Sequence, residues 1–131
     1  MDKPEPSRAI GADEWRQIVD SAVGTAIITT DLEGRVTSWN EGAFRMLGWT
    51  SSEVLGDTLE RLFPPGEGVS ALRQEMSDAL TVGRGGGMEG WRIRRDGSQI
   101  WAVGEMSPIR DHAGTVVGFT KILRDRTSDR E

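Results

Sequence analysis

Residues 88–123 read MEGWRIRRDGSQIWAVGEMSPIRDHAGTVVGFTKIL. Three stretches of this segment, 88–94, 99–106 and 115–123, have the composition of strands, and turn sequences at 95–97 and 111–114 separate them. Consecutive strands with such short connections pair as antiparallel neighbours. The segment therefore predicts a three-stranded antiparallel layer.

Neither face of this layer is plainly polar. Alternation along the strands assigns to one face Met88, Gly90, Ile100, Ala102, Gly104, Met106, Val117, Phe119 and Leu123, and to the other Trp91, Ile93, Trp101, Val103, Val116 and Ile122. Apolar patches of this size rarely stay in water, so both faces need cover. We expect the chain's own helices on the first face, and an N-terminal helix or a second subunit on the other. The residues expected at this second contact are Trp15, Trp91, Trp101 and Ile122.

The segment before residue 88 predicts two more strands and several short helices. Residues 25–30 and 35–39 have the β-branched content of a hairpin around a turn at 31–34. Asn40 is expected to cap a helix over 41–47 that ends at Gly48, and Thr50 with Glu53 has the spacing of a capping box. A longer helix is indicated by the 3.6-residue period of Val69, Leu72, Met76, Ala79 and Leu80. This order predicts an α+β domain with a five-stranded, mostly antiparallel sheet.

The two ends of the chain differ from this central part. Residues 1–10 hold two prolines and little apolar surface, which is typical of a disordered tail. Residues 11–23 carry apolar side chains at Trp15, Ile18, Val19 and Ala22, the stripe of an N-terminal flanking helix. The domain itself is expected over 24–127, and 128–131 is interpreted as the start of a C-terminal linker.

Composition excludes several classes of function. The 131 residues include 16 Lys and Arg against 21 Asp and Glu, a net charge of −5 that argues against nucleic acid as a partner. There is no cysteine, so disulfides, thiolate catalysis and Cys-ligated metal sites are excluded. No apolar run is long enough to cross a membrane and no signal peptide is apparent, so we expect a cytoplasmic protein without membrane insertion.

No catalytic constellation stands out either. His112, which is the single histidine, lies in a polar turn, where no metal site is expected and where it activates no Ser or Thr nucleophile. The glycines at 83 and 85–87 precede a strand and lack the Lys and Ser/Thr of a phosphate-binding loop. The sequence therefore predicts a protein that is not an enzyme.

Taken together, the motifs resemble a PAS (Per-ARNT-Sim) sensory domain over residues 15–127. The resemblance is carried by IITTDLEGRV (27–36), WN (39–40), LGW (47–49), EVLG (53–56), WRIRRDG (91–97), PIRD (108–111), and GF (118–119) leading to RDRT (124–127). It implies a five-stranded PAS-like fold and a sensory input domain of a bacterial signalling protein, commonly a histidine kinase. A homodimer and a downstream kinase or other effector are the implied partners. The alternative is a ligand-free homodimerisation module.

The resemblance also implies an exit site for the signal. In the family an Asp-x-Thr follows the last strand, which corresponds here to Asp125 and Thr127, and the Asp pairs with a basic residue that corresponds to Arg95, with Arg94 as its neighbour. Such a pair would fix the direction in which the chain leaves the sheet. The alternative is a surface ion pair without a signalling role.

Two cofactors of the family are argued against. The light-sensing branch needs a cysteine where Leu59 stands, and its flavin-binding amides correspond to Arg92, Ala102 and Leu123. Haem-binding members supply a histidine from the helical segment, and residues 42–82 contain none. Non-covalent FAD or a small organic ligand stays open.

A ligand pocket is expected between the helices and the sheet, where small residues leave volume. Its expected lining is Ile28, Thr30, Phe44, Leu59, Met76, Arg92, Ala102, Gly104, Phe119 and Lys121. Inward-pointing Arg92 and Lys121 would favour an anionic or carbonyl-bearing ligand if no protein acid neutralises them. The alternative is a filled core from which both cations reach water.

Overall fold

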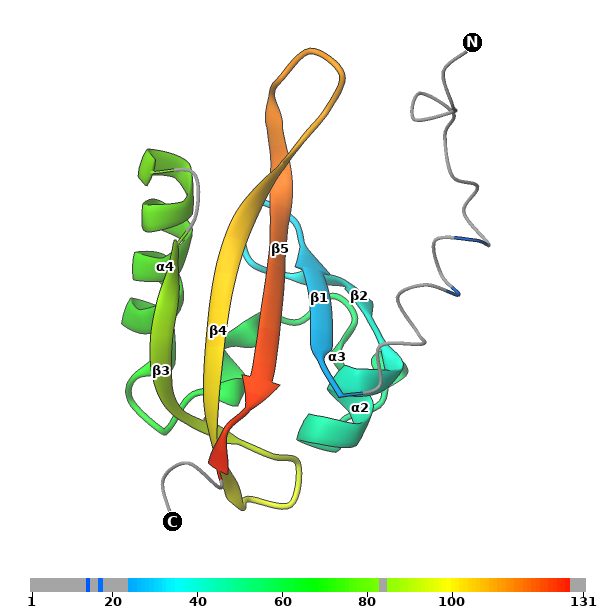
Figure 1. The fold of residues 1–131 in the computed structure, drawn as a ribbon, viewed down its shortest axis with the longest axis vertical. Coiled ribbons are helices and arrows are strands. Elements are labelled where there is room, and N and C mark those ends of the chain that lie inside the picture. Colours follow the sequence, from blue (N-terminus) through cyan, green and yellow to red (C-terminus); the bar gives the residue numbers. More distant parts are fainter. Residues whose placement is uncertain (1–13, 15–16, 18–23, 83–84, 128–131) are drawn as a thin grey trace, which may run out of the picture.

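A computed structural model of the chain describes residues 14, 17, 24–82 and 85–127. Five antiparallel strands form one sheet in the order β2-β1-β5-β4-β3, with helices between β2 and β3 (Figure 1). The elements along the chain are β1 Ala26–Thr30, β2 Val36–Trp39, α2 Glu41–Leu47, α3 Ser51–Val54, the 3-10 helix η2 Leu59–Leu62, α4 Gly68–Val82, β3 Gly85–Ile93, β4 Gln99–Arg110 and β5 Val116–Asp125. This confirms the expected α+β class and sheet.

Asn40 joins the first hairpin to the helical layer. Its Oδ1 accepts hydrogen bonds from the amides of Ala43 at 2.8 Å and Ile27 at 2.9 Å, and its Nδ2 donates to the Thr25 carbonyl at 3.1 Å. The predicted cap of α2 is therefore confirmed, and the same side chain also ties α2 to β1. Gly48 ends α2 at φ +87°, a left-handed conformation that glycine adopts without strain.

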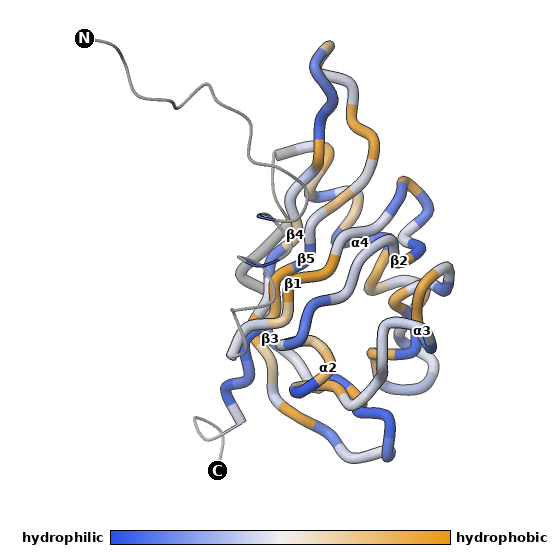
Figure 2. The backbone as a smooth tube through the Cα atoms, turned by 90° about the vertical axis from the view of Figure 1, so that its right-hand side faces the viewer, coloured by the Kyte–Doolittle hydropathy of each residue, from blue (hydrophilic) through white to orange (hydrophobic). Residues whose placement is uncertain are grey.

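The helices α2, α3 and α4 lie on one side of the sheet (Figure 2). Between these layers lies the apolar core, whose largest fully buried members include Ile28, Leu47, Leu59, Ile100, Met106, Phe119 and Leu123. The expected cover of this face by the chain's own middle segment is confirmed.

Val69, Leu80 and Val117 are among the apolar residues that were expected on buried faces and are exposed instead. Val69 and Leu80 of α4 are 50% and 51% exposed, because the helix turns the stripe of Leu72, Glu75 and Ala79 toward the sheet. Val117 is 48% exposed because it lies near the tip of the β4–β5 hairpin, which projects beyond the helices (Figure 1). The side chain of Met88 lies outside the described part of the structure.

Several expectations for the chain ends fall outside the described residues. They include the tail over 1–10, the linker over 128–131 and Trp15. Within the flanking segment 11–23, only Glu14 and Gln17 are described, and both are helical. No helix among the described residues is long and apolar enough to cross a membrane.

Candidate signal-exit and interior charge sites

The end of β5 is held to β4 by a compact set of hydrogen bonds. Asp125 Oδ1 accepts from the Thr127 amide at 2.9 Å and from the Thr127 hydroxyl at 2.6 Å. The Trp101 amide donates to Thr127 Oγ1 at 3.0 Å, and the Arg126 amide donates to the Trp101 carbonyl at 2.7 Å. Both main-chain polar groups of Trp101 are thus bonded to the segment that follows β5, and we call this set of bonds the exit clamp.

The basic partner of the exit clamp is Arg94 and not Arg95. Arg94 Nη2 lies 3.7 Å from Asp125 Oδ2, whereas Arg95 Nη2 lies 2.6 Å from Glu53 Oε2. The expected Arg95–Asp125 pair was therefore wrong. Both arginines lie in the turn after β3, which ends at Ile93, and there the Arg94 side chain reaches Asp125 while the Arg95 side chain reaches Glu53 in the helical layer.

Arg95 fixes the β3–β4 turn to the α2–α3 connection. Its amide donates to the Leu47 carbonyl at 2.8 Å, and its guanidinium carbon lies 5.7 Å from the centroid of the Trp49 ring. A Cβ added to Gly48 would lie 3.2 Å from Arg95 Cβ, which shows how closely the two segments pack. Sequence reasoning did not identify this contact, because it joins residues more than 40 positions apart.

Glu53 combines the predicted capping box with this long-range pair. The Thr50 amide donates to Glu53 Oε1 at 2.8 Å, and Arg95 Nε donates to Oε2 at 2.8 Å. The backbone hydrogen bond from Thr50, followed by the bond from Arg95, holds the pKa of Glu53 below its ordinary value.

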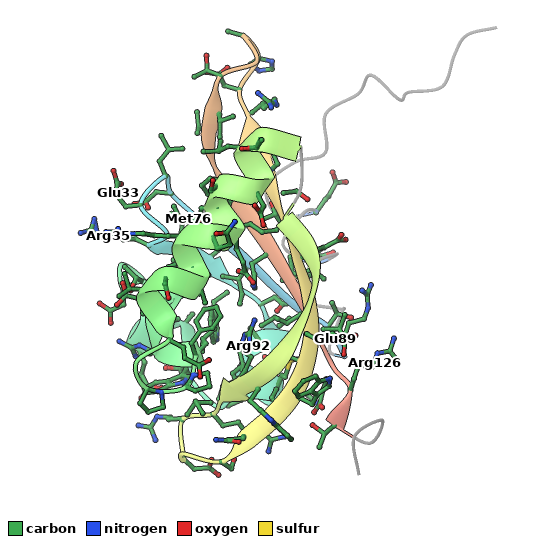
Figure 3. All side chains as sticks on the ribbon, turned by 90° about the vertical axis from the view of Figure 1, so that its left-hand side faces the viewer. Glu33, Arg35, Met76, Glu89, Arg92 and Arg126 are labelled. Carbon is green, nitrogen blue, oxygen red and sulfur yellow. The ribbon has the colours of Figure 1, made fainter. Side chains whose placement is uncertain are left out.

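The interior between α4 and the sheet contains three charged side chains. Arg92 of β3 and Lys121 of β5 are 5% and 1% exposed, and Glu75 of α4 is 1% exposed. Lys121 Nζ donates to Glu75 Oε1, and Arg92 Nη2 lies 3.6 Å from Glu75 Oε2. Figure 3 shows Arg92 between β3 and α4. Both cations point inward, so the alternative in which they reach water was wrong.

Glu75 was missed by sequence reasoning. Its position was a usable signal, because it lies between Leu72 and Ala79 on the stripe of α4 that the helical period turns inward. Arg92 also stacks on Phe63, with its guanidinium carbon 4.2 Å from the ring centroid. Burial lowers the pKa of Lys121, and Glu75 opposes that shift.

Most of the residues expected to line a pocket lie together in this interior. Ile28, Thr30, Leu59, Ala102, Gly104 and Phe119 are buried with Arg92 and Lys121, and Met76 is half-buried against the core. Phe44 is 41% exposed on α2, where Ala43 and Leu47 take the inward positions, so its placement in the lining was wrong. A Cβ added to Gly104 would lie 2.6 Å from Leu123 Cδ2, so the volume expected beside this glycine is filled.

A groove of ≈ 410 Å³ lies at the end of the interior, between η2, α4 and β3. Its lining includes the apolar side chains of Phe63, Pro64, Pro65, Val69 and Ile93, with Glu60 and Arg61 beside them. Phe63 thus contacts Arg92 and also lines this groove. Sequence reasoning did not anticipate it.

The other face of the sheet carries a tryptophan pair. The rings of Trp91 and Trp101 meet edge to face, with centroids 5.1 Å apart and planes at 79°. Trp101 Nε1 donates to Glu89 Oε1 at 3.1 Å, Trp91 is 39% exposed, and Ile122 is half-buried. We call Trp91, Trp101 and Ile122 the outer face.

The comparisons with known proteins agree with this architecture. The family model described as the PAS fold matches residues 13–126. The chain is 35% identical over 118 residues to Two-component system protein A of Emericella nidulans, covering 89% of this chain and 17% of that protein. It is 26% identical over 121 residues to the sensor histidine kinase TmoS of Ectopseudomonas mendocina, covering 89% of this chain and 12% of that protein.

A solved structure shares the same fold. The crystal structure of a PAS domain from Colwellia psychrerythraea superposes with a TM-score of 0.78 at 24% identity, covering 88% of this chain and 97% of that one. The chain belongs to the PAS family. It is homologous to segments of two-component signalling proteins and spans less than a fifth of the length of the two curated relatives.

Proposed function

We propose that this chain is a cytoplasmic sensory input domain that controls a downstream effector such as a histidine kinase. In this proposal, binding of a ligand or partner biases two arrangements of the end of β5, and the residues after Thr127 transmit the difference. The domain itself carries out no chemical reaction. Its homology to two-component system protein A and to the sensor histidine kinase TmoS supports the effector class.

The observation that carries the proposal is the exit clamp. Asp125 and Thr127 bind each other, and Thr127 binds Trp101 of the neighbouring strand, so the direction of the chain after β5 depends on β4. Any ligand can shift the balance of two arrangements only by its differential affinity for them. A clamp of a few exposed or partly buried hydrogen bonds suits such a balance, because each contributes only about 1 kcal/mol.

The homodimer is part of the proposal, with the outer face as its contact. Trp91 is 39% exposed and stands beside Trp101, and aromatic residues of this kind are enriched at the centre of protein interfaces. In the alternative function, this contact alone is the role of the domain and no small molecule binds. Native mass spectrometry of the purified chain separates the two, since it reports the oligomer and any retained ligand, including non-covalent FAD.

The proposed effector role is tested by fusing residues 1–131 to a histidine kinase core. We expect the autophosphorylation rate of the fusion to differ from that of the same core alone. An identical rate, with and without cell extract as a source of ligand, would contradict the sensory role and favour the dimerisation module.

A further inference from the structure

The interior of the domain holds two cations around one buried carboxylate. Arg92 and Lys121 come from β3 and β5, and Glu75 reaches them from α4. The cations hold different oxygens of the same carboxylate, Lys121 on Oε1 and Arg92 on Oε2. Glu67 also attracts the Arg92 guanidinium, but it is exposed, so water screens its charge.

Two cations that meet the two oxygens of one carboxylate could also bind the carboxylate of a small molecule. Two cations on different elements converge on two oxygens, and an aromatic ring, Phe63, lies 4.2 Å from the guanidinium carbon of Arg92. In addition, Arg92 Nε is buried and has no hydrogen-bond acceptor among the described residues. The Nε–H group of Arg92 is therefore an unused hydrogen-bond donor, although Glu75 already occupies the position between the two cations.

We propose that Glu75 is the internal ligand of an anion-binding site formed by Arg92 and Lys121, and that a carboxylate-bearing small molecule replaces it there. The inference rests on the proposed sensory function, to which it adds the class of ligand. Exchange of one carboxylate for another keeps the charge of the interior constant, so it avoids the cost of burying an additional ion. It also releases the charged contacts of Glu75 in α4 with Arg92 in β3 and Lys121 in β5.

The groove beside η2 adjoins this site through Phe63. Phe63 is 6% exposed and forms part of the groove wall, and its ring centroid lies 4.2 Å from the guanidinium carbon of Arg92. The apolar lining by Pro64, Pro65, Val69 and Ile93 suits a ligand with an apolar body. The ligand class is therefore an amphipathic monocarboxylate.

The site is tested by chemical rescue in the 131-residue chain. Glu75→Ala removes the internal carboxylate and leaves space, whereas Glu75→Gln removes the charge and keeps the volume. Thermal unfolding is measured in sodium formate and in sodium chloride at equal pH and ionic strength. We expect formate to raise the Tm of Glu75→Ala saturably, by at least about 4 °C more than that of wild type. An equal response of Glu75→Ala, Glu75→Gln and wild type would overturn the proposal.

A second pair of variants covers the case in which Glu75→Ala does not fold. Glu75→Ala combined with Arg92→Met keeps Lys121 as the one cation of the three charged residues. An unpaired buried lysine can release its proton, so this variant need not bury an uncompensated charge. Adding Lys121→Met gives a triple variant with the same vacated carboxylate position and no cation. Formate should raise the Tm of the double variant and leave that of the triple variant at the chloride value. The same response in both would overturn the proposal.

The wild-type chain tests the ligand class directly. A ligand released from the purified protein and identified by mass spectrometry should carry a carboxylate, and a ligand without a carboxylate would overturn the proposal. These measurements need no kinase, so they are separate from the fusion assay. If formate rescues Glu75→Ala but the fused kinase is unregulated, only the sensory role is contradicted. If the fused kinase is regulated but formate gives no rescue, only the anion site is contradicted.

Discussion

The hydroxyl of Thr127 accepts a hydrogen bond from the main-chain amide of Trp101 at 3.0 Å. Thr127 lies after the last strand, where the chain leaves the sheet, and the side chain of Trp101 packs against Trp91 on the outer face. One residue of β4 therefore takes part in both the exit clamp and the surface that we assign to a partner. A displacement of Trp101 at the outer face would therefore alter its hydrogen bond with Thr127.

The outer face is tested by Trp101→Glu. A buried charge at a dimer contact has no partner, so we expect sedimentation velocity to show a dimer for wild type and a monomer for the variant. The control is Phe44→Glu, which places the same charge on an exposed aromatic residue of the helical side; Phe44 is 41% exposed, close to the 39% of Trp91. Loss of the dimer in both variants, or in neither, would argue against this contact.

Arg95 and Arg94 are expected to have separate effects. Arg95→Ala removes a cation 5.7 Å from the Trp49 ring and the pair with Glu53, so it should change the fluorescence of Trp49. Arg94→Ala should leave that fluorescence unchanged, since Arg94 faces Asp125. Both pairs are partly exposed and screened by water, so each variant should lose little of the free energy of unfolding. A change of equal size in the two spectra would contradict the separation.

The titration of Glu53 provides a test by pH. Hydrogen bonds from Thr50 and Arg95 lower its pKa below the ordinary 4.5 in the folded chain. A carboxyl with a depressed folded pKa contributes stability above its unfolded pKa, and that contribution is lost as the pH falls through the folded value. Carbon-detected NMR should place the Glu53 midpoint below 4.5, and Arg95→Ala should move it upward. An unshifted midpoint in the variant would show that Arg95 does not act on Glu53.

The buried charges are tested by two substitutions that are expected to differ in the size of their effect. Glu75→Gln leaves two buried cations without their carboxylate and should lower the free energy of unfolding by ~3–5 kcal/mol. Arg92→Met leaves the matched pair of Glu75 and Lys121, so we expect a change of about 1 kcal/mol or less. Urea unfolding measures both values. A loss of ~3–5 kcal/mol in Arg92→Met would contradict the expectation that Glu75 and Lys121 form a matched pair without Arg92.

Features set by neighbouring residues could be predicted from the sequence. The cap by Asn40, the end of α2 at Gly48 and the Thr50–Glu53 box depend on side chains within a few positions of the backbone groups that they satisfy. The three-stranded layer followed equally from strand composition and short turns. These local rules, applied in order along the chain, were enough to indicate the fold.

Features set by distant residues could not be predicted in the same way. Arg95 was assigned to Asp125 because the sequence cannot say to which side each of two adjacent arginines projects. Phe44 and Leu47 share one side of a short helix on a helical wheel, but the sheet contacts only the part that includes Leu47. Glu75 was overlooked since a carboxylate on an apolar stripe is compatible with burial only when cations from other elements meet it.

The central claim is that the signal leaves the domain through the exit clamp, and the most direct measurement is the autophosphorylation rate of the kinase fusion carrying Asp125→Ala or Thr127→Val. Asp111→Ala is the matched control, because Asp111 accepts the same kind of turn hydrogen bonds in the β4–β5 hairpin, away from the exit. The account predicts that both exit variants return the rate to that of the kinase core alone, while Asp111→Ala keeps the wild-type rate. Exit variants that remain folded and keep the full effect of the domain on the kinase would contradict it.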